Sequence, residues 1–289
     1  MVYFSYEMSG HLIVSGEDAA DFLQSQFSAD LGHLRPGQAV YGLWLDVRGR
    51  IVADSWVFCQ AQERFHLFSE HGSASTIAAK LERHIVADEV IIAIQSEAPA
   101  VALIDERAEA RANEAGAFAC LPGRRGRTPS AECVFQSVSG RDAFVNSLGS
   151  EAISEAQLHA FRLEAGVPLV PQEAGPGELP GEVGLDHDAV DFQKGCFLGQ
   201  EVVARMRNVG KPTRGLYLVR SGDSPPSCPA DITGREGKTI GELRSVHVEE
   251  NGWRGVALLK IRALEAASGI FVNGQELVVI NEYTQAAEI

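Results

Sequence analysis

Between positions 15 and 31, apolar residues recur every three or four positions, which is the spacing of a helix. One face carries most of the apolar side chains: Ala19, Phe22, Leu23, Gln26 and Phe27. Ser15 followed by Asp18 resembles the capping box that begins many helices, with Asp in place of Glu or Gln. We therefore predict a helix over residues 15–31 that starts at Ser15.

Two strand-like runs follow at positions 39–58, separated by a turn at Asp46–Arg50. Gly49 supplies the backbone freedom that such a turn needs, so the pattern predicts a β-hairpin. The next elements, in order, are a strand at 64–70, an amphipathic helix at 73–87, and short strands at 89–95 and 100–105. A polar region over 107–130 follows, with a loop at 122–130.

A second clear helix spans residues 154–165. It ends at Gly166, and Pro168 follows closely, which is typical of a helix stop. Residues 170–186 are rich in glycine and proline and predict an extended, irregular segment. Long irregular segments inside a compact domain usually have a function.

The pattern changes near Pro212. From there the chain consists of short apolar runs separated by Gly, Asp, Asn or Ser turns, at 214–222, 238–250, 253–261 and 269–280. This pattern predicts a separate C-terminal domain, a small β-barrel or sandwich.

Composition narrows the class of protein. The 289 residues are 45% hydrophobic and 22% charged, which is typical of a globular protein that needs no disulfides. No apolar run approaches the ~20 residues of a membrane span, and residues 1–18 show neither an export signal nor an arginine-rich transit peptide. We expect a cytoplasmic protein without a membrane partner. The net charge of −14 argues against direct nucleic-acid binding.

The chain contains five cysteines: Cys59, Cys120, Cys133, Cys196 and Cys228. Their odd number, wide spacing and lack of a C-x-x-C pair argue against a disulfide framework and against a zinc site. We expect reduced thiols and no bound metal.

Cys196 lies in the stretch "KGCFLGQEVVAR", just before a predicted helix that begins near Gln200. Helix amides and the positive charge of Lys194 would stabilise a thiolate there, which favours a reactive cysteine. A free cysteine is also among the most commonly buried residue types, so a purely structural role fits the same pattern. Residue chemistry leaves both interpretations open.

Two further features suggest a binding site. Glu164 lies near the predicted C-terminal end of a helix, where the helix dipole disfavours a carboxylate, so it needs either a basic partner or a ligand with N–H donors. The densest basic cluster surrounds Cys196 and could hold an anionic ligand or form a solvated face: Lys194, Arg205, Arg207, Lys211 and Arg214.

Three segments together resemble one family. They are "DAADFLQSQFSADL", "FRLEAGVPL" and "DFQKGCFLGQEVVAR", in this order. The pattern K-G-C-[FY]-x-G-Q-E matches fully from Lys194 to Glu201. The chain thus resembles the YgfZ family, folate-binding relatives of the glycine-cleavage T-protein (aminomethyltransferase) that are associated with iron–sulfur cluster assembly and repair.

The resemblance implies a fold of the α+β class. Residues 1–211 would form a folate-binding region of two interleaved α/β subdomains around a central channel, and residues 212–289 a C-terminal β-barrel. Tetrahydrofolate or a one-carbon derivative is the implied ligand. Glu164 matches the residue whose carboxylate contacts the pterin ring in T-proteins. An arginine such as Arg205 would meet the anionic glutamate tail, with Gln200 nearby.

One position departs from the T-protein pattern. Where T-proteins carry an adjacent Asp-Asp pair in the hairpin, this chain has Ala53-Asp54. Because aminomethyl transfer needs a positioned carboxylate, the change argues against that reaction. Asp54 can still point into the channel, although strand alternation places it on the opposite face from Ala53.

The resemblance therefore predicts a folate-binding accessory protein for the synthesis or repair of iron–sulfur proteins. Cys196 would be its working thiol, with Lys194 lowering the thiol pKa, and its partners would be iron–sulfur client or assembly proteins. We expect a monomer. The alternative is a folate-dependent aminomethyltransferase or another enzyme of one-carbon metabolism, and a role in tRNA modification would be indirect, through an iron–sulfur enzyme.

Overall fold

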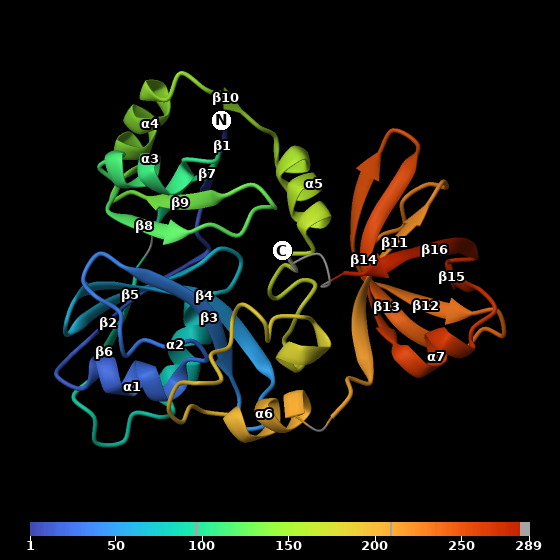
Figure 1. Cartoon of the computed structure of the whole chain (residues 1–289), viewed down its shortest axis with the longest axis horizontal. Coiled ribbons are helices and arrows are strands. Elements are labelled where there is room, and N and C mark those ends of the chain that lie inside the picture. Colours follow the sequence, from blue (N-terminus) through green and yellow to red (C-terminus); the bar gives the residue numbers. More distant parts are fainter. Residues whose placement is uncertain (96–97, 209, 284–289) are drawn as a thin grey trace.

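The computed structural model describes residues 1–95, 98–208 and 210–283. Figure 1 shows two α/β parts on the left and a β-barrel on the right, with helices α5 and α6 and an irregular segment between them. The predicted α+β class, with two α/β subdomains and a C-terminal barrel, is confirmed. Among the described residues, no helix combines the length and apolarity needed to cross a membrane.

The first α/β part, drawn in blue in Figure 1, contains a five-stranded antiparallel sheet in the order β3-β4-β5-β2-β6. Two helices, α1 and α2, pack on it. The bounds are β2 (Gly10–Ser15), α1 (Ala19–Gln26), β3 (Ala39–Leu45), β4 (Ile51–Ala61), β5 (Arg64–Ser69), α2 (Ala74–Glu82) and β6 (Ile91–Ile94). The predicted hairpin is confirmed as β3–β4, with Gly49 at a φ of 72° in its turn.

The start of the first helix differs from the prediction. Ser15 is the last residue of β2, and α1 begins at Ala19 after Asp18. The Asp18 carboxylate accepts a hydrogen bond from the Glu89 N–H at 2.8 Å and does not cap the helix. The predicted capping box is therefore wrong, because a contact distant in sequence takes the side chain. The predicted apolar face is buried as expected: Ala19, Phe22, Leu23 and Gln26.

The second α/β part is a five-stranded sheet in the order β10-β1-β7-β9-β8, with α3 and α4 beside it. Its elements are β1 (Val2–Glu7), β7 (Pro99–Ile104), α3 (Ala108–Glu114), β8 (Ala119–Pro122), β9 (Ser130–Val134), α4 (Val138–Ser147) and β10 (Glu151–Ala152). Because β1 precedes the first part in sequence and β7 follows it, the two parts are interleaved. The loop predicted at residues 122–130 is confirmed as the connection between β8 and β9, whereas α3 and β8 in the polar region before it were not predicted.

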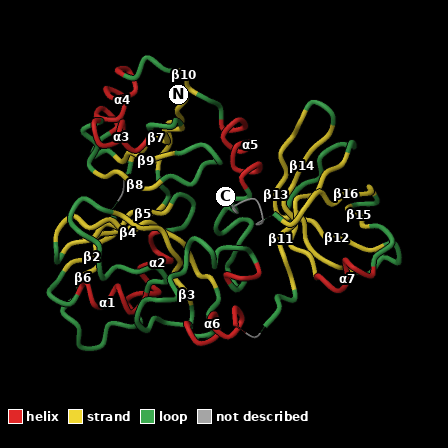
Figure 2. Tube along the Cα trace, in the orientation of Figure 1, coloured by secondary structure: helices red, strands yellow, loops and turns green. Residues whose placement is uncertain are grey.

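A helix and a long irregular segment lie between the α/β parts and the barrel. Helix α5 (Glu155–Ala165) has a full capping box formed by Ser154 and Gln157, and it ends at Gly166 with a φ of 71°. Figure 2 shows that the chain from α5 to α6 (Gln200–Asn208) is mostly loop, interrupted by the short 3-10 helix η1 (Pro180–Glu182). The predicted helix stop and the predicted irregular segment are both confirmed.

The C-terminal part is a closed barrel with strand order β11-β14-β13-β12-β15-β16. Its elements are β11 (Arg214–Ser221), β12 (Ala230–Gly234), β13 (Thr239–Glu249), β14 (Gly252–Lys260), α7 (Ile261–Ala266), β15 (Ile270–Val272) and β16 (Gln275–Glu282). Closure leaves no free strand edge. β12 is absent from the sequence-based prediction, because its pattern is short and follows a proline-rich stretch.

A shared core joins the three parts. One cluster of buried apolar side chains includes Trp56 of β4, Leu121 of β8, Leu185 of the irregular segment, Val203 of α6 and Leu258 of the barrel. Burying apolar surface contributes about 25 cal/mol per Å². The same burial therefore stabilises each part and fixes its position against the others.

Candidate functional site

A cavity of 340 Å³ lies between β1, the end of β5, the β8–β9 loop and α5. A narrow extension of 30 Å³ continues from it towards β4. The cavity and its extension, which we call the central cavity, share the lining residues Glu70, His71, Arg125, Arg162 and Leu169. Its main volume falls within the range of about 300–1,000 Å³ that is typical of small-molecule sites.

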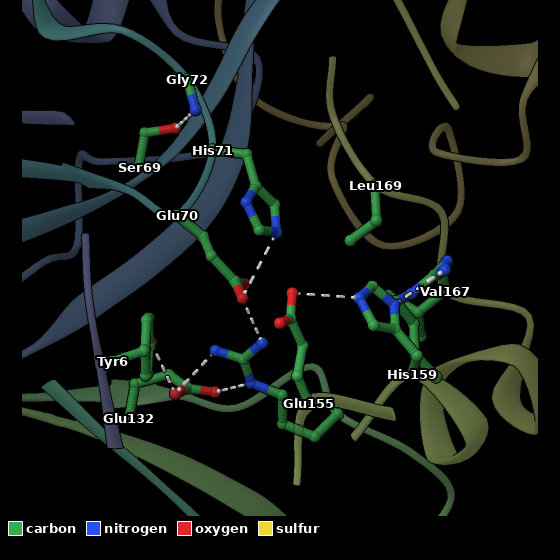
Figure 3. Close-up of polar contacts among 12 residues, drawn as sticks. Tyr6, Ser69, Glu70, His71, Gly72, Glu132, Glu155, His159, Val167 and Leu169 are labelled. Carbon is green, nitrogen blue, oxygen red and sulfur yellow. Dashed lines mark hydrogen bonds and ion pairs between the residues drawn. The ribbon is translucent and has the colours of Figure 1, made fainter. Parts of the chain in front are cut away.

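Arg125 organises one wall of the central cavity. Its guanidinium donates two hydrogen bonds to Glu132, at 2.7 and 3.0 Å, and a third to Glu70 at 2.5 Å. Tyr6 donates its hydroxyl to the same Glu132 at 2.8 Å (Figure 3). Burial by itself would raise the pKa of Glu70, but the Arg125 charge lowers it below the usual value. This wall is a rigid network of paired charges.

Arg162 of α5 organises the opposite wall. Its terminal nitrogens donate to both carboxylate oxygens of Glu173, at 2.6 and 2.9 Å, and one of them also donates to Tyr283 of the barrel at 2.9 Å. Its Nε is buried and has no hydrogen-bond partner within the described part of the chain. A buried donor without a partner costs about 1–3 kcal/mol.

Two histidines lie at the rim of the central cavity, each beside a carboxylate (Figure 3). The Nε2 atom of His71 is 3.4 Å from Glu70, and that of His159 is 3.7 Å from Glu155. Burial lowers the pKa of His159, and the Arg162 charge lowers it further. At neutral pH His159 is therefore an uncharged imidazole that can donate and accept hydrogen bonds.

Asp54 lies at the inner end of the narrow extension. Its carboxylate accepts hydrogen bonds from the Tyr41 hydroxyl at 2.8 Å and from Ser69 at 3.2 Å. The Arg124 guanidinium covers the Tyr41 ring at 3.7 Å. Burial raises the pKa of Asp54, against the opposing effect of the Tyr41 hydrogen bond. Asp54 lines the extension, while Ala53 packs into the core beneath the sheet.

Lys194 is buried and fastens the motif loop to α1. Its ammonium donates to the backbone carbonyls of Gln24, Phe27 and Ala29, at 2.8, 2.8 and 2.9 Å. These carbonyls belong to the last turn of α1 and the residues that follow, so Lys194 caps that helix end. Burial lowers the pKa of Lys194 to about 8. Its effect on the thiol of Cys196 stays a prediction.

Cys196 is exposed, and its thiol is free. It lies four residues before α6, which begins at Gln200 as predicted. Gly199, with a φ of 84°, packs so tightly on the β3–β4 turn that an added Cβ would lie 2.6 Å from the Asp46 carbonyl oxygen. The exposed position excludes the alternative of a buried structural cysteine. Whether the thiol reacts stays a prediction.

The predicted binding residues do not come together. Gln200 and Arg205 lie on α6, and neither lines the central cavity. Glu164 is exposed on α5 and lines a different cavity of 350 Å³ beside the barrel, together with Arg127 and Arg254. Its contact with a pterin ring stays a prediction, and the structure separates it from Asp54.

The basic cluster around the motif is divided among several partners. The Arg207 guanidinium lies over the Phe192 ring at 4.1 Å, and Arg214 donates to Glu182 at 2.8 Å. The sequence-based prediction did not include the cavity arginines Arg124, Arg125 and Arg162. The run "GRRGR" in the loop after Pro122 was the available signal for two of them, since adjacent arginines in a glycine-rich loop often bind anions or carboxylates.

Comparison with known proteins adds to this geometry. The family model described as "GCVT N-terminal domain" matches residues 3–109. The tRNA-modifying protein YgfZ of Yersinia enterocolitica is 24% identical over 257 residues, which cover 81% of this chain and 75% of that protein. The corresponding protein of Klebsiella pneumoniae is 26% identical, with 71% and 67% covered. The predicted resemblance to YgfZ proteins is confirmed.

A solved structure shows the same fold. The aminomethyltransferase T of the glycine cleavage system from Bartonella henselae superposes with a TM-score of 0.76 at 20% identity, covering 96% of this chain and 85% of that one. The superposition spans both α/β parts and the barrel. The chain therefore combines sequence resemblance to YgfZ proteins with the fold of an aminomethyltransferase.

Proposed function

We propose that the protein binds tetrahydrofolate, or a one-carbon derivative of it, in the central cavity and acts as an accessory protein for the synthesis or repair of iron–sulfur proteins. The observation that carries the proposal is the central cavity itself. A buried carboxyl with a raised pKa, Asp54, lies at its inner end, and Arg162 lines both the cavity and its extension.

The lining residues fit a pterin ring. Such a ring presents adjacent N–H donors and acceptors, which match the carboxyl group of Asp54. Trp56 and Tyr41 also line the extension, with their ring planes at 61° to each other. Because the extension measures only 30 Å³, a ring that reaches Asp54 would displace the adjacent segment 167–170. When bound, the folate supplies or accepts a one-carbon unit.

The glutamate tail of the folate would extend towards the rim of the central cavity. His71 lies there with its side chain 43% exposed, and it also lines a third cavity of 590 Å³ together with Arg48 and Arg50. Both arginines are exposed on the β3–β4 turn. We infer that they, together with the predicted Arg205, are candidates for pairing with the tail carboxylates.

Cys196 would act outside the central cavity. It is exposed on the loop that Lys194 and Gly199 hold against the α/β part, so a large protein partner can reach the thiol. This exposure supports a role in sulfur or redox chemistry with an iron–sulfur client. The relatives bear the name tRNA-modifying protein. For this chain we propose that such a role is indirect, through an iron–sulfur enzyme that modifies tRNA.

A second candidate function is folate-dependent aminomethyl transfer, which the fold likeness favours. In that case Asp54 would position the reacting folate nitrogen and Cys196 would be dispensable. Product formation that survives Cys196→Ala and is lost in Asp54→Ala would establish the transferase. The opposite dependence would support the accessory role.

The test of the accessory role uses cells that lack the protein. Wild type, Cys196→Ala and Cys228→Ala would each be expressed in these cells. The activity of an iron–sulfur tRNA-modifying enzyme would then be measured as the amount of modified nucleosides in total tRNA. We expect Cys228→Ala to restore modification and Cys196→Ala to fail at equal protein levels. Full restoration by Cys196→Ala would contradict the proposed working thiol.

A further inference from the structure

Two other cysteines face each other across neighbouring strands. In the β8–β9 pair, Cys120 is directly opposite Cys133. The turn hydrogen bond from Gly123 N–H to the Ser130 carbonyl marks a hydrogen-bonded pair, and such pairs alternate along an antiparallel ladder. Cys120 and Cys133 therefore form a non-hydrogen-bonded pair, the type with the closer side chains.

This geometry suits a disulfide. Cα atoms of a non-hydrogen-bonded pair lie about 4.5 Å apart, which falls within the ~4.4–6.8 Å over which a disulfide closes. Both cysteines are free thiols in the structure. Cys133 is completely buried and Cys120 is half-buried, so a small oxidant meets Cys120 first.

The thiols also interact with each other. The Cys120 thiol donates a hydrogen bond to the Ala112 carbonyl oxygen at 3.0 Å, and its sulfur accepts a hydrogen bond from the Cys133 thiol. That hydrogen bond lowers the pKa of Cys120, more than burial raises it, and it raises the pKa of Cys133. Because Cys120 is the more exposed of the two thiols, we infer that it is the nucleophile of the pair and that Cys133 is the resolving thiol.

We propose that Cys120 and Cys133 form a redox-active dithiol that closes to a disulfide at the base of the β8–β9 hairpin. The loop of this hairpin carries Arg124 and Arg125 into the central cavity and Arg127 into the cavity beside the barrel. The disulfide would tie together the two strands that position these arginines. The inference concerns the chain's own thiols and is independent of the proposed folate ligand.

The oxidant is a hydroperoxide. The Cys120 thiolate attacks a peroxide oxygen, the O–O bond breaks, and the sulfenic acid forms as one water leaves after proton uptake. The Cys133 sulfur then attacks the Cys120 sulfur, the S–S bond forms, and the hydroxyl leaves as a second water. In total two thiols lose two electrons and two protons to one hydrogen peroxide, which becomes two waters.

The test uses the purified full-length protein and equimolar hydrogen peroxide, followed by alkylation, trypsin and mass spectrometry without reductant. Cleavage after arginine places Cys120 in peptide 112–124 and Cys133 in peptide 128–141, and neither peptide holds another cysteine. We expect these peptides to be joined, with the intact mass lower by two hydrogen atoms and the free thiols reduced from five to three.

Variants make the result specific. Cys120→Ser is expected to abolish the joined peptide, whereas Cys59→Ser, which changes a cysteine of another sheet, is expected to leave it intact. Dithiothreitol should separate the two peptides again. Over-oxidation of Cys120 to a sulfonic acid, a different cysteine pairing, or unchanged thiols after equimolar peroxide would each overturn the proposal. Because the wild-type peptide map decides the question, a poorly folded variant does not obscure it.

Discussion

Replacing Lys194 with methionine removes a single ammonium that serves three backbone carbonyls, those of Gln24, Phe27 and Ala29. Methionine keeps most of the apolar stem and leaves the carbonyls without that donor. A buried polar group left unpaired costs about 1–3 kcal/mol, so three carbonyls set an upper bound of about 9 kcal/mol. The actual loss of stability is smaller than this bound, because water partly hydrates the carbonyls and because the substitution also removes a buried, desolvated charge. We expect a loss of about 3–5 kcal/mol in the free energy of unfolding.

The assay is urea unfolding followed by tryptophan fluorescence, since Trp44 packs near the same end of α1. Lys211→Met, which changes an exposed lysine, is the matched control and should alter the unfolding free energy by less than about 0.5 kcal/mol. Alkylation of Cys196 at several pH values in both variants reports whether Lys194 influences the thiol. A Lys194→Met protein as stable as the Lys211→Met control would refute the capping role.

Three further predictions concern stability. Gly199→Ala should destabilise the fold by at least about 2 kcal/mol in urea unfolding, because its φ is 84° and the new Cβ would meet the Asp46 carbonyl; unchanged stability would contradict this close packing. Arg125→Met should cost about 3–5 kcal/mol by leaving the fully buried Glu132 without its cation, and simultaneous Glu132→Gln should recover part of that loss in a double-mutant cycle. Burial lowers the pKa of His66 to about 4 from 6.5, so the unfolded chain binds the extra proton first. Stability should therefore fall as the pH drops from about 6.5 to 4, by about 2 kcal/mol after allowance for solvent screening, and His66→Leu should flatten that part of the pH profile.

The sequence predicted the elements whose signals are local. The buried face of α1, the β3–β4 hairpin and the end of α5 at Gly166 depend on spacing and turn chemistry within a few residues. The start of α1 was predicted wrongly because Asp18 bonds to Glu89, which lies far along the chain and gives no signal near Ser15.

The candidate site was predictable only in part, for the same physical reason. Strand alternation placed Asp54 on the opposite face from Ala53, but it gave no signal for the tyrosine and serine hydroxyls that bind its carboxylate. The pairing of Arg162 with Glu173 and Tyr283 depends on how α5 packs against the barrel, and no spacing rule reports that contact. The direction of the Lys194 ammonium likewise depends on where α1 ends in space. The K-G-C motif identified Lys194 but gave no signal for the three backbone carbonyls that its ammonium contacts.

A calorimetric titration with tetrahydrofolate tests whether a folate binds in the central cavity. Wild type would be compared with Asp54→Asn, Glu164→Gln and Cys196→Ala. We expect saturable binding to the wild type, unchanged binding in Cys196→Ala, and affinity at least about tenfold weaker in Asp54→Asn, which corresponds to about 1.4 kcal/mol. If Glu164→Gln alone weakened the binding of tetrahydrofolate, the ligand would bind in the cavity beside the barrel and not in the central cavity. No binding to any of the four proteins would contradict the proposed folate binding altogether.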